Sequence, residues 1–551
     1  MLSEKVCLEE LQEGGQGLSS SDIRGSAQFG TGRAEHGGQP GLGRGGQAGQ
    51  GVRGQRESTQ ECPVMTSLKK VLTLKEVSPM AHRLTGLKTD LLIARAEELR
   101  REIKQGVKKP FKEVIEVHSG DGQAMGTKPV TFIRQVMAAC FYPELLQRDR
   151  LPHDVKFRAQ ELLQQCGGSV GVYSDTFGLE YVQHSVARFI EERDGGVPCD
   201  PQNIYLTAGS QKAGQLLLNL LVHTSGCGSG PCGTGVLVPV PCSPWFSLAL
   251  QEAGGVRLPY FLADQGVCWE LDVQELQRVV QSARGHCTPS VLYINNPGNP
   301  TGHVQSRQSI EEVIRFAASE GLYLLVDEVY QDSVFGQGRA FLSYKKVLYE
   351  MGPEFSSRVE LAAIHSASKG VAGECGSRCG FIEFVNLDPQ VKSLSASYFS
   401  ANSLPPTSGQ LVLVTALHPP RAGEPSYYTW TQESQSHLSS LSRNAALVVE
   451  SLDRIPGIRV LSPQGGFFCF PRIHIPPLVV QEAETQGLSP DLFYCLRFLE
   501  EWGVAVGPGS DFGEREGIHH IRLNLLLPHD KLKSVLESLE KFHLQFTEEF
   551  S

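Results

Sequence analysis

A lysine that follows a short run of small and hydroxylated residues could act as a nucleophile in this chain. Lys369 closes the segment Ser366-Ala367-Ser368-Lys369, and Arg378 follows a short distance downstream. A lysine amine whose charge is disfavoured by its surroundings attacks an aldehyde and holds it covalently. The Ser366 hydroxyl and the Arg378 guanidinium are suited to bind one anion, such as a phosphate. We therefore interpret these residues as one site for a phosphorylated aldehyde.

Three further residues could hold an aromatic ring beside this lysine. Asp327 ends the apolar run 322–326, and open α/β sheets bind ligands at the carboxyl ends of their strands. A buried carboxylate there would keep a pyridine nitrogen protonated, with Glu328 as the competing candidate. Tyr330 and Asn299 could bind a phenolate oxygen, and Asn299 lies in the rigid Pro- and Gly-rich turn 296–302. Together these groups indicate pyridoxal 5'-phosphate, with Lys369 as base and acid in turn.

Two other segments carry groups suited to anions. Gly209, Ser210 and Gln211 stand between a predicted strand and a predicted helix, so their backbone N–H groups could bind the cofactor phosphate. Arg522 lies in the apolar stretch 520–524, and a fixed guanidinium binds a carboxylate with two parallel hydrogen bonds. We predict that Arg522, with Asn299 nearby, binds the α-carboxylate of the substrate.

These residues need a scaffold, and the pattern of the chain predicts an α/β fold. From about residue 201, short apolar runs alternate with amphipathic stretches, which indicates βαβ units and a mostly parallel sheet covered by helices. Helical spacing after Ser309, with Glu312 completing a capping box, predicts one of the intervening helices. The expected strands are 203–206, 236–240, 291–294, 322–326, 361–364 and 381–385.

The same pattern predicts four segments along the chain. Residues 1–64 form a Gly-, Gln-, Ser- and Arg-rich tail that we expect to be disordered. Residues 65–130 contribute to a smaller domain and to dimer contacts, 131–419 form the large cofactor-binding domain, and 420–551 form the small α+β domain. In the last segment, a long helix around 438–452 precedes another that ends near Trp502, capped by Gly503.

Composition narrows the partners and the compartment. A net charge of -10 argues against nucleic acid as a partner, and no run approaches the ~18 apolar residues of a membrane span. Scattered cysteines without repeated spacing predict reduced thiols rather than disulfides or a metal site. The acidic start is unlike a mitochondrial presequence. We expect a cytoplasmic protein, with a mitochondrial location and a start at Met65 left open.

Several segments resemble the class I aminotransferases of fold type I, and among them the alanine aminotransferases. The resemblance runs from about residue 89 to the end of the chain. It implies a homodimer with active sites at the subunit interface, and reversible amino transfer between L-alanine and 2-oxoglutarate. It also implies that Tyr173 reaches the cofactor phosphate of the partner subunit. The matching segments are 106–111, 120–126, 296–302, 327–332, 373–376 with Arg378, and 508–513.

A few positions depart from that family pattern. Gly209-Ser210-Gln211 stands where the family has Gly-Ala-Ser, so the hydroxyl is displaced by one position. Ser243 stands where the family has an aromatic ring that stacks on the pyridine, with Trp245 as an alternative stacking group. Three hypotheses therefore stay open: an alanine transaminase, a non-enzymatic member of the family kept for binding or regulation, and an enzyme with another substrate or reaction.

Overall fold

The computed structural model describes residues 72–551 except residues 85, 224–232, 265 and 403. Leu72–Ser551 forms one compact unit. The predicted disordered tail 1–64 and Met65 lie outside the described residues. Among the described helices, none has the length and apolar character needed to cross a membrane.

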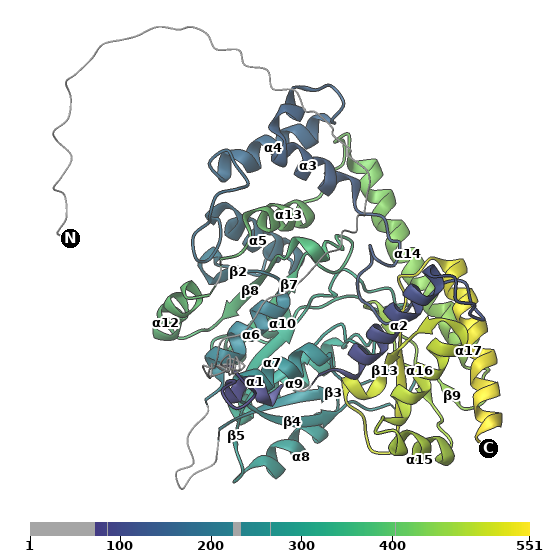
Figure 1. Cartoon of the computed structure of the whole chain (residues 1–551). Coiled ribbons are helices and arrows are strands. Elements are labelled where there is room, and N and C mark those ends of the chain that lie inside the picture. Colours follow the sequence, from purple (N-terminus) through teal and green to yellow (C-terminus); the bar gives the residue numbers. More distant parts are fainter. Residues whose placement is uncertain (1–71, 85, 224–232, 265, 403) are drawn as a thin grey trace, which may run out of the picture. The chain divides into compact units, whose positions relative to one another are not determined.

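A seven-stranded sheet forms the centre of the larger part of this unit (Figure 1). Its strand order is β2-β8-β7-β6-β5-β3-β4, and every neighbouring pair is parallel except the two that involve β8. This confirms the predicted α/β class with a mostly parallel sheet. The strands are β2 (Ile204–Thr207), β3 (Thr234–Val240), β4 (Val256–Phe261), β5 (Thr288–Asn295), β6 (Tyr323–Asp327), β7 (Leu361–Ser366) and β8 (Gly380–Val385).

Sequence reasoning missed β4, which lies at one edge of the sheet. Most of its side chains are exposed or half-buried, and it contains Arg257 and Pro259. A proline that cannot donate a hydrogen bond is tolerated on an edge strand, where one side has no partner. The strand therefore lacks the apolar run that revealed the other six strands.

Helices cover both faces of the sheet because alternate residues of each buried strand point to opposite faces. On β5, Leu292 and Ile294 pack in the core formed with α8, α9 and α10, whereas Val291 and Tyr293 pack in the core formed with α6, α7 and α12. The helices of this part are α3 (Thr131–Phe141), α4 (His153–Gln165), α5 (Glu180–Arg193), α6 (Ser210–Leu221), α7 (Pro244–Ala253), α8 (Val273–Ala283), α9 (Arg307–Glu320), α10 (Tyr344–Glu350), α11 (Pro353–Ser356), α12 (Pro389–Ser400) and α13 (Thr407–Leu417).

The predicted capping box at Ser309 is wrong. Helix α9 begins at Arg307, and its N-cap is Ser306, whose hydroxyl accepts a hydrogen bond from the Ser309 amide at 3.2 Å. Ser309 is thus the third helical residue, and its amide is the donor that an N-cap side chain satisfies.

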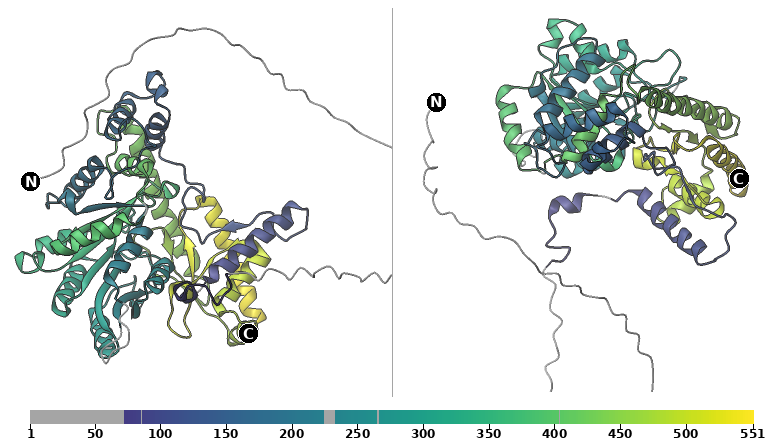
Figure 2. Two further views of the ribbon diagram at one scale, coloured as in Figure 1. Left: turned by 60° about the vertical axis from the view of Figure 1, so that its left-hand side comes forward. Right: turned by 90° about the horizontal axis from the view of Figure 1, so that it is seen from above.

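The C-terminal part contains a second, five-stranded sheet with helices packed on it (Figure 2). Helix α16 (Pro490–Trp502) ends at Gly503, which has φ of 70°, as predicted. The predicted long helix is α14 (Tyr427–Leu452). The other elements are β9 (Ile458–Arg459), β10 (Phe468–Cys469), β11 (Arg472–Ile473), α15 (Pro477–Thr485), β12 (Val504–Ala505), β13 (Gly507–Pro508), β14 (His519–Asn524) and α17 (His529–Glu549).

The N-terminal segment completes this second part. Helix α2 (Lys88–Lys104) follows the short helix α1 (Pro79–Arg83), and β1 (Ile115–Glu116) pairs in parallel with β12. Leu92 and Leu99 of α2 are fully buried in the same apolar core as Phe498 of α16 and Phe542 of α17. Tyr330, which follows β6 of the large sheet, also lies in this core. Residues near the candidate site therefore join the two sheets.

Candidate active site

The predicted site residues gather at the carboxyl ends of neighbouring strands. Asn295 ends β5, Asp327 ends β6 and Ser366 ends β7. Asn295 and Asp327 are direct partners in the parallel ladder. Gly209, the N-cap of α6, lies beside the same sheet because β2 delivers the chain to it. Parallel strands end at one edge of a sheet, so the topology itself assembles these groups.

Asp327 is buried, with 3% of its surface exposed. Its carboxylate accepts hydrogen bonds from the Tyr293 hydroxyl at 3.1 Å and from the Val329 amide at 3.3 Å. Burial raises the pKa of Asp327 to about 6, against the opposing effects of these two bonds and of the Lys369 charge. A buried carboxylate with a raised pKa is stabilised by a cationic neighbour, which a protonated pyridine nitrogen supplies.

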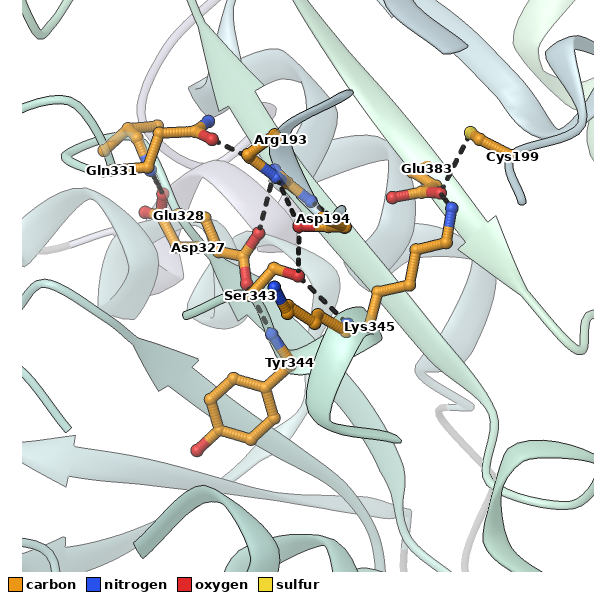
Figure 3. Close-up of polar contacts among 12 residues, drawn as sticks. Arg193, Asp194, Cys199, Asp327, Glu328, Gln331, Ser343, Tyr344, Lys345 and Glu383 are labelled. Atoms are coloured by element: carbon orange, nitrogen blue, oxygen red, sulfur yellow. Dashed lines mark hydrogen bonds and ion pairs between the residues drawn. The ribbon is translucent and has the colours of Figure 1, made fainter. Parts of the chain in front are cut away.

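Glu328, the competing candidate, points into a different environment (Figure 3). Its carboxylate accepts from the Tyr344 amide at 3.0 Å and lies 3.6 Å from the Arg193 guanidinium. Arg193 also pairs with Asp194 at 2.7 Å, and Ser343 donates to Asp194 at 2.9 Å. Glu328 therefore ties the end of α5 to the start of α10, and Asp327 alone faces Lys369.

The ion pairs of Arg193 with Asp194 and Glu328 should be essential for the stability of the fold. Arg193→Gln leaves the carboxylates of Asp194 and Glu328, both of which are buried, without their guanidinium. Breaking a buried ion pair from one side costs about 3–5 kcal/mol, and we expect a loss of that size in urea unfolding. The matched control is Arg358→Gln, which changes an exposed arginine. Equal stability of the two variants would contradict the structural role of Arg193.

The surroundings of Lys369 favour the uncharged form of its amine. Its amine donates to the Gly120 carbonyl at 3.0 Å and lies 6.0 Å from the centre of the Phe467 ring. Burial lowers the pKa of Lys369, which favours the uncharged amine that attacks a carbonyl carbon. A Cβ at Gly120 would lie 3.1 Å from the lysine nitrogen, so the glycine leaves the amine its space.

Arg522 lies in the second sheet, on β14, and reaches the same place. Its guanidinium is held between the rings of Phe468 and Phe512, whose centres lie 4.1 and 4.5 Å away. It donates to the His118 carbonyl and, at 3.4 Å, to the Asn299 side chain. Burial lowers the pKa of Arg522 to about 10. Within the described residues its Nε is buried without a hydrogen-bond partner and no carboxylate lies within 4.0 Å, so an anion is the partner it lacks.

Asn299 links Arg522 to the turn before α7. Its amide nitrogen donates to the Ser243 hydroxyl at 3.2 Å, and its backbone amide donates to Asn295 at 2.6 Å. Tyr330 is buried beside them, where burial raises its pKa and the Arg522 charge lowers it. The side chains of Asn299 and Tyr330 therefore lie near the predicted carboxylate-binding group.

The predicted phosphate-binding groups meet at the start of α6. Gly209 has φ of 95°, and Ser210 is the first helical residue. The first backbone N–H groups of α6 therefore have no acceptor within the helix. The Arg378 guanidinium donates to the carbonyls of Cys375 at 2.8 Å and Ala208 at 3.2 Å. A Cβ at Gly209 would lie 2.6 Å from Arg378 Nη2. The close approach requires glycine and places the guanidinium over the helix start.

One predicted residue does not join this group. Tyr173 is 92% exposed, so its side chain does not reach the site of its own chain. Gln211, the second residue of α6, is exposed and lines a surface hollow of about 630 Å³ together with Ala208, Arg378 and Trp245. The Trp245 ring lies against Gly214 of α6, where a Cβ would approach it to 2.5 Å.

Sequence reasoning missed two supporting residues. Tyr293 binds the Asp327 carboxylate, and Asn295 accepts from the Asn299 amide while its own side chain donates to the Asp327 carbonyl at 3.1 Å. Tyr293 lies in the expected strand 291–294, and Asn295 directly follows it and ends β5. Their polar groups inside a buried strand were the signal, because buried polar groups need partners.

Comparison with known proteins identifies the family of this site. The family model of the class I and II aminotransferases matches residues 141–539. The chain belongs to the class I and II aminotransferases. It is therefore a pyridoxal phosphate-dependent transaminase, as the site residues predicted.

Two relatives of this aminotransferase are similar over nearly their whole length. The chain is 50% identical to alanine aminotransferase 2 of Xenopus tropicalis, with 88% of this chain and 91% of the relative covered. It is 47% identical to human alanine aminotransferase 1, with 88% and 96% covered. A solved alanine aminotransferase from Pyrococcus furiosus, at 21% identity, covers 85% of this chain and 100% of its own, with a TM-score of 0.66. That likeness confirms the fold.

The residues present fit pyridoxal phosphate. The buried Asp327 carboxylate suits a protonated ring nitrogen, and the Lys369 amine with its lowered pKa suits an aldehyde. The start of α6, with the Arg378 guanidinium above it, suits a phosphate dianion. The ring nitrogen, the aldehyde and the phosphate of the cofactor are each matched by a protein group of suitable charge or reactivity.

Proposed function

We propose that this aminotransferase reversibly transfers the amino group between L-alanine and 2-oxoglutarate, giving pyruvate and L-glutamate. The observation that carries the proposal is the Arg522 guanidinium, whose buried Nε has no hydrogen-bond partner among the described residues. Arg522 lies on β14 of the second sheet, and Lys369 follows β7 of the first. The names of relatives at 47% and 50% identity support alanine as the donor. A buried cation without a counterion favours substrates that carry a carboxylate.

Each residue of the site has a proposed part. Lys369 holds the cofactor and then moves a proton to and from the substrate α-carbon. Asp327 keeps the ring nitrogen protonated, while Tyr330 and Asn299 bind the ring oxygen. Arg522 and Asn299 bind the substrate carboxylate. When bound, the cofactor would delocalise the electron pair that remains on the α-carbon after its proton has moved to Lys369. The proposed phosphate-binding residues are Gly209, Ser210, Gln211, Ser366, Arg378 and the partner subunit's Tyr173.

The exposed Tyr173 supports a homodimer. An aromatic side chain that is 92% exposed is hardly covered by its own chain, which suits a residue that reaches across an interface. All described cysteines are free thiols, which supports a reducing compartment, and we propose the cytoplasm.

We also propose the division of the chain predicted from sequence, with 65–130 joined to a small domain 420–551 and 131–419 as the large domain. The shared core of Leu92 and Leu99 with Phe498 and Phe542 supports it.

A donor panel tests the proposed function. Purified dimeric enzyme with added cofactor is assayed with L-alanine, L-aspartate, L-serine and L-phenylalanine, each with 2-oxoglutarate. We expect L-alanine to give the highest kcat/KM and a stoichiometric yield of pyruvate and L-glutamate. A higher kcat/KM with another donor would overturn the assignment of alanine while leaving the transaminase chemistry in place.

Asp327 predicts a pH dependence of stability for the cofactor-free protein. Its folded pKa is about 6, whereas an unfolded aspartate titrates near pH ~4, so the folded state holds the proton more tightly. The stability that Asp327 contributes relative to asparagine is therefore fully present below about pH 4 and is lost as the pH rises to about 6. Relative to Asp327→Asn, the wild type should lose on the order of 2–3 kcal/mol between pH 4 and pH 7. Urea unfolding of both proteins measures this difference, and a constant difference would contradict it.

A further inference from the structure

Three potential metal ligands converge in the second part of the structure, outside the aminotransferase site. Asp491 lies at the start of α16, Glu514 follows the short turn 509–512, and His519 begins β14. One carboxylate oxygen of each acid and one ring nitrogen of His519 lie within 4.8 Å of one another. Asp491 is distant from the other two residues in the sequence, and the three show none of the paired Cys and His spacing that makes a metal site recognisable there.

Asp491 has a carboxylate oxygen that lacks a partner. The side chain is 1% exposed. Its Oδ2 accepts from the Ser510 amide at 2.8 Å and from the Ser510 hydroxyl at 2.6 Å. Within the described part of the chain, its Oδ1 is buried without a hydrogen bond. A buried, unpaired carboxylate oxygen is unfavourable unless a cation or a proton is added.

Among the described residues, the Glu514 carboxylate contacts the two histidines of β14. Its Oε1 accepts from the His520 amide at 2.6 Å and lies 3.2 Å from the His520 ring nitrogen. Its Oε2 lies 3.9 Å from His519 Nδ1. Burial and the charge of Asp491 raise the pKa of Glu514 to about 9. No lysine or arginine of the described residues lies within 4.0 Å of either acid, and the Lys88 charge acts on Glu514 without a direct ion pair.

His519 is suited to complete the ligand set. Burial, with the charges of Arg472 and Lys88, lowers its pKa below the ordinary value, while Asp491 opposes this. An imidazole nitrogen is a common ligand of divalent metal ions. His519 also lines a cavity of about 680 Å³.

We propose that Asp491, Glu514 and His519 bind a divalent cation, with Zn²⁺ as the metal that their two oxygens and one nitrogen fit best. Three protein ligands with water in a fourth position form a common zinc coordination. The cation would neutralise both acids and join the start of α16 to β14. The adjoining Asp511 accepts from the backbone amides of Lys88 at 2.9 Å and Thr89 at 2.8 Å, so the site also lies next to the anchor of α2.

The test measures zinc binding to the holoenzyme. The protein is dialysed against a chelator and then against buffer, and Zn²⁺ affinity is measured by competition with a chromophoric chelator. We expect one tight site per chain and a melting temperature that rises with Zn²⁺. Asp491→Asn, Glu514→Gln and His519→Phe should each weaken binding by about 10- to 100-fold or more, since even indirect ligand partners have effects of that size.

The matched control is Glu516→Gln, which changes an exposed acid two residues from Glu514 and should bind zinc as the wild type does. Because Asp491 also binds Ser510, its variant can unfold, and the Glu514 and His519 variants then decide the question. Zinc affinity that is equal in all four variants, or no tight site in the wild type, would overturn the proposal. A melting temperature that Glu514→Gln raises and Zn²⁺ leaves unchanged would show a shared proton in place of the metal. None of these outcomes decides the proposed amino donor, which the donor panel tests separately.

Discussion

Lys369→Ala should reduce pyruvate formation from L-alanine and 2-oxoglutarate by at least about 10⁴-fold. In our proposal the amine both attaches the cofactor and moves the proton at the substrate α-carbon, and proton transfer alone contributes up to ~10⁴-fold. The lowered pKa of Lys369 and its hydrogen bond to Gly120 at 3.0 Å indicate an amine held ready for this chemistry. A coupled assay for pyruvate, with saturating cofactor, measures the loss.

The control for this variant is Lys128→Ala, which removes an exposed lysine and should keep wild-type activity. Circular dichroism and urea unfolding establish that Lys369→Ala is folded. Activity within tenfold of the wild type in a folded Lys369→Ala protein would contradict the assignment of the nucleophile, whatever the preferred donor is.

Arg522→Ala should lower kcat/KM for both substrates by roughly 30- to 5000-fold. Removing one partner of a buried charge pair costs about 2–5 kcal/mol, which corresponds to that range of rate constants. Arg522→Lys should recover only part of the loss, because an ammonium keeps the charge without the two parallel hydrogen bonds of a guanidinium. The rings of Phe468 and Phe512, 4.1 and 4.5 Å from the guanidinium carbon, also favour arginine.

Steady-state kinetics with varied L-alanine and varied 2-oxoglutarate separate this effect from a general loss of folding. Arg443→Ala removes an exposed arginine of α14 and should leave both kcat/KM values unchanged. A normal kcat/KM in Arg522→Ala, with the protein folded, would move carboxylate recognition to another residue.

The central strands and their functional ends could be predicted because both follow from local pattern. Buried parallel strands are continuous apolar runs, and Asp327 stands out as the acid that ends one of them. Gly209 before a helix and Lys369 after a strand are recognisable for the same reason. The edge strand β4 lacks such a run, because most of its side chains are exposed or half-buried, and its sequence resembles a loop.

The choice between Asp327 and Glu328 needed the structure. Neighbouring residues at a strand end point in different directions, and only the positions of Arg193 and Tyr344 show that Glu328 is already engaged. The same holds for Asp491, Glu514 and His519, which come from separate elements and meet only after folding. Contacts between distant segments leave no periodic pattern in a sequence.

The side chain of Asn299 lies between Arg522, the proposed carboxylate-binding residue, and Ser243. Its oxygen accepts from Arg522 at 3.4 Å, while its amide nitrogen donates to the Ser243 hydroxyl at 3.2 Å. A substrate carboxylate that draws the guanidinium toward itself withdraws a donor from this oxygen and frees the amide to turn. If Arg522 binds the substrate carboxylate and Asn299 the ring oxygen, as we propose, the arrival of an amino acid would therefore change the hydrogen bonds that Asn299 has available for that oxygen.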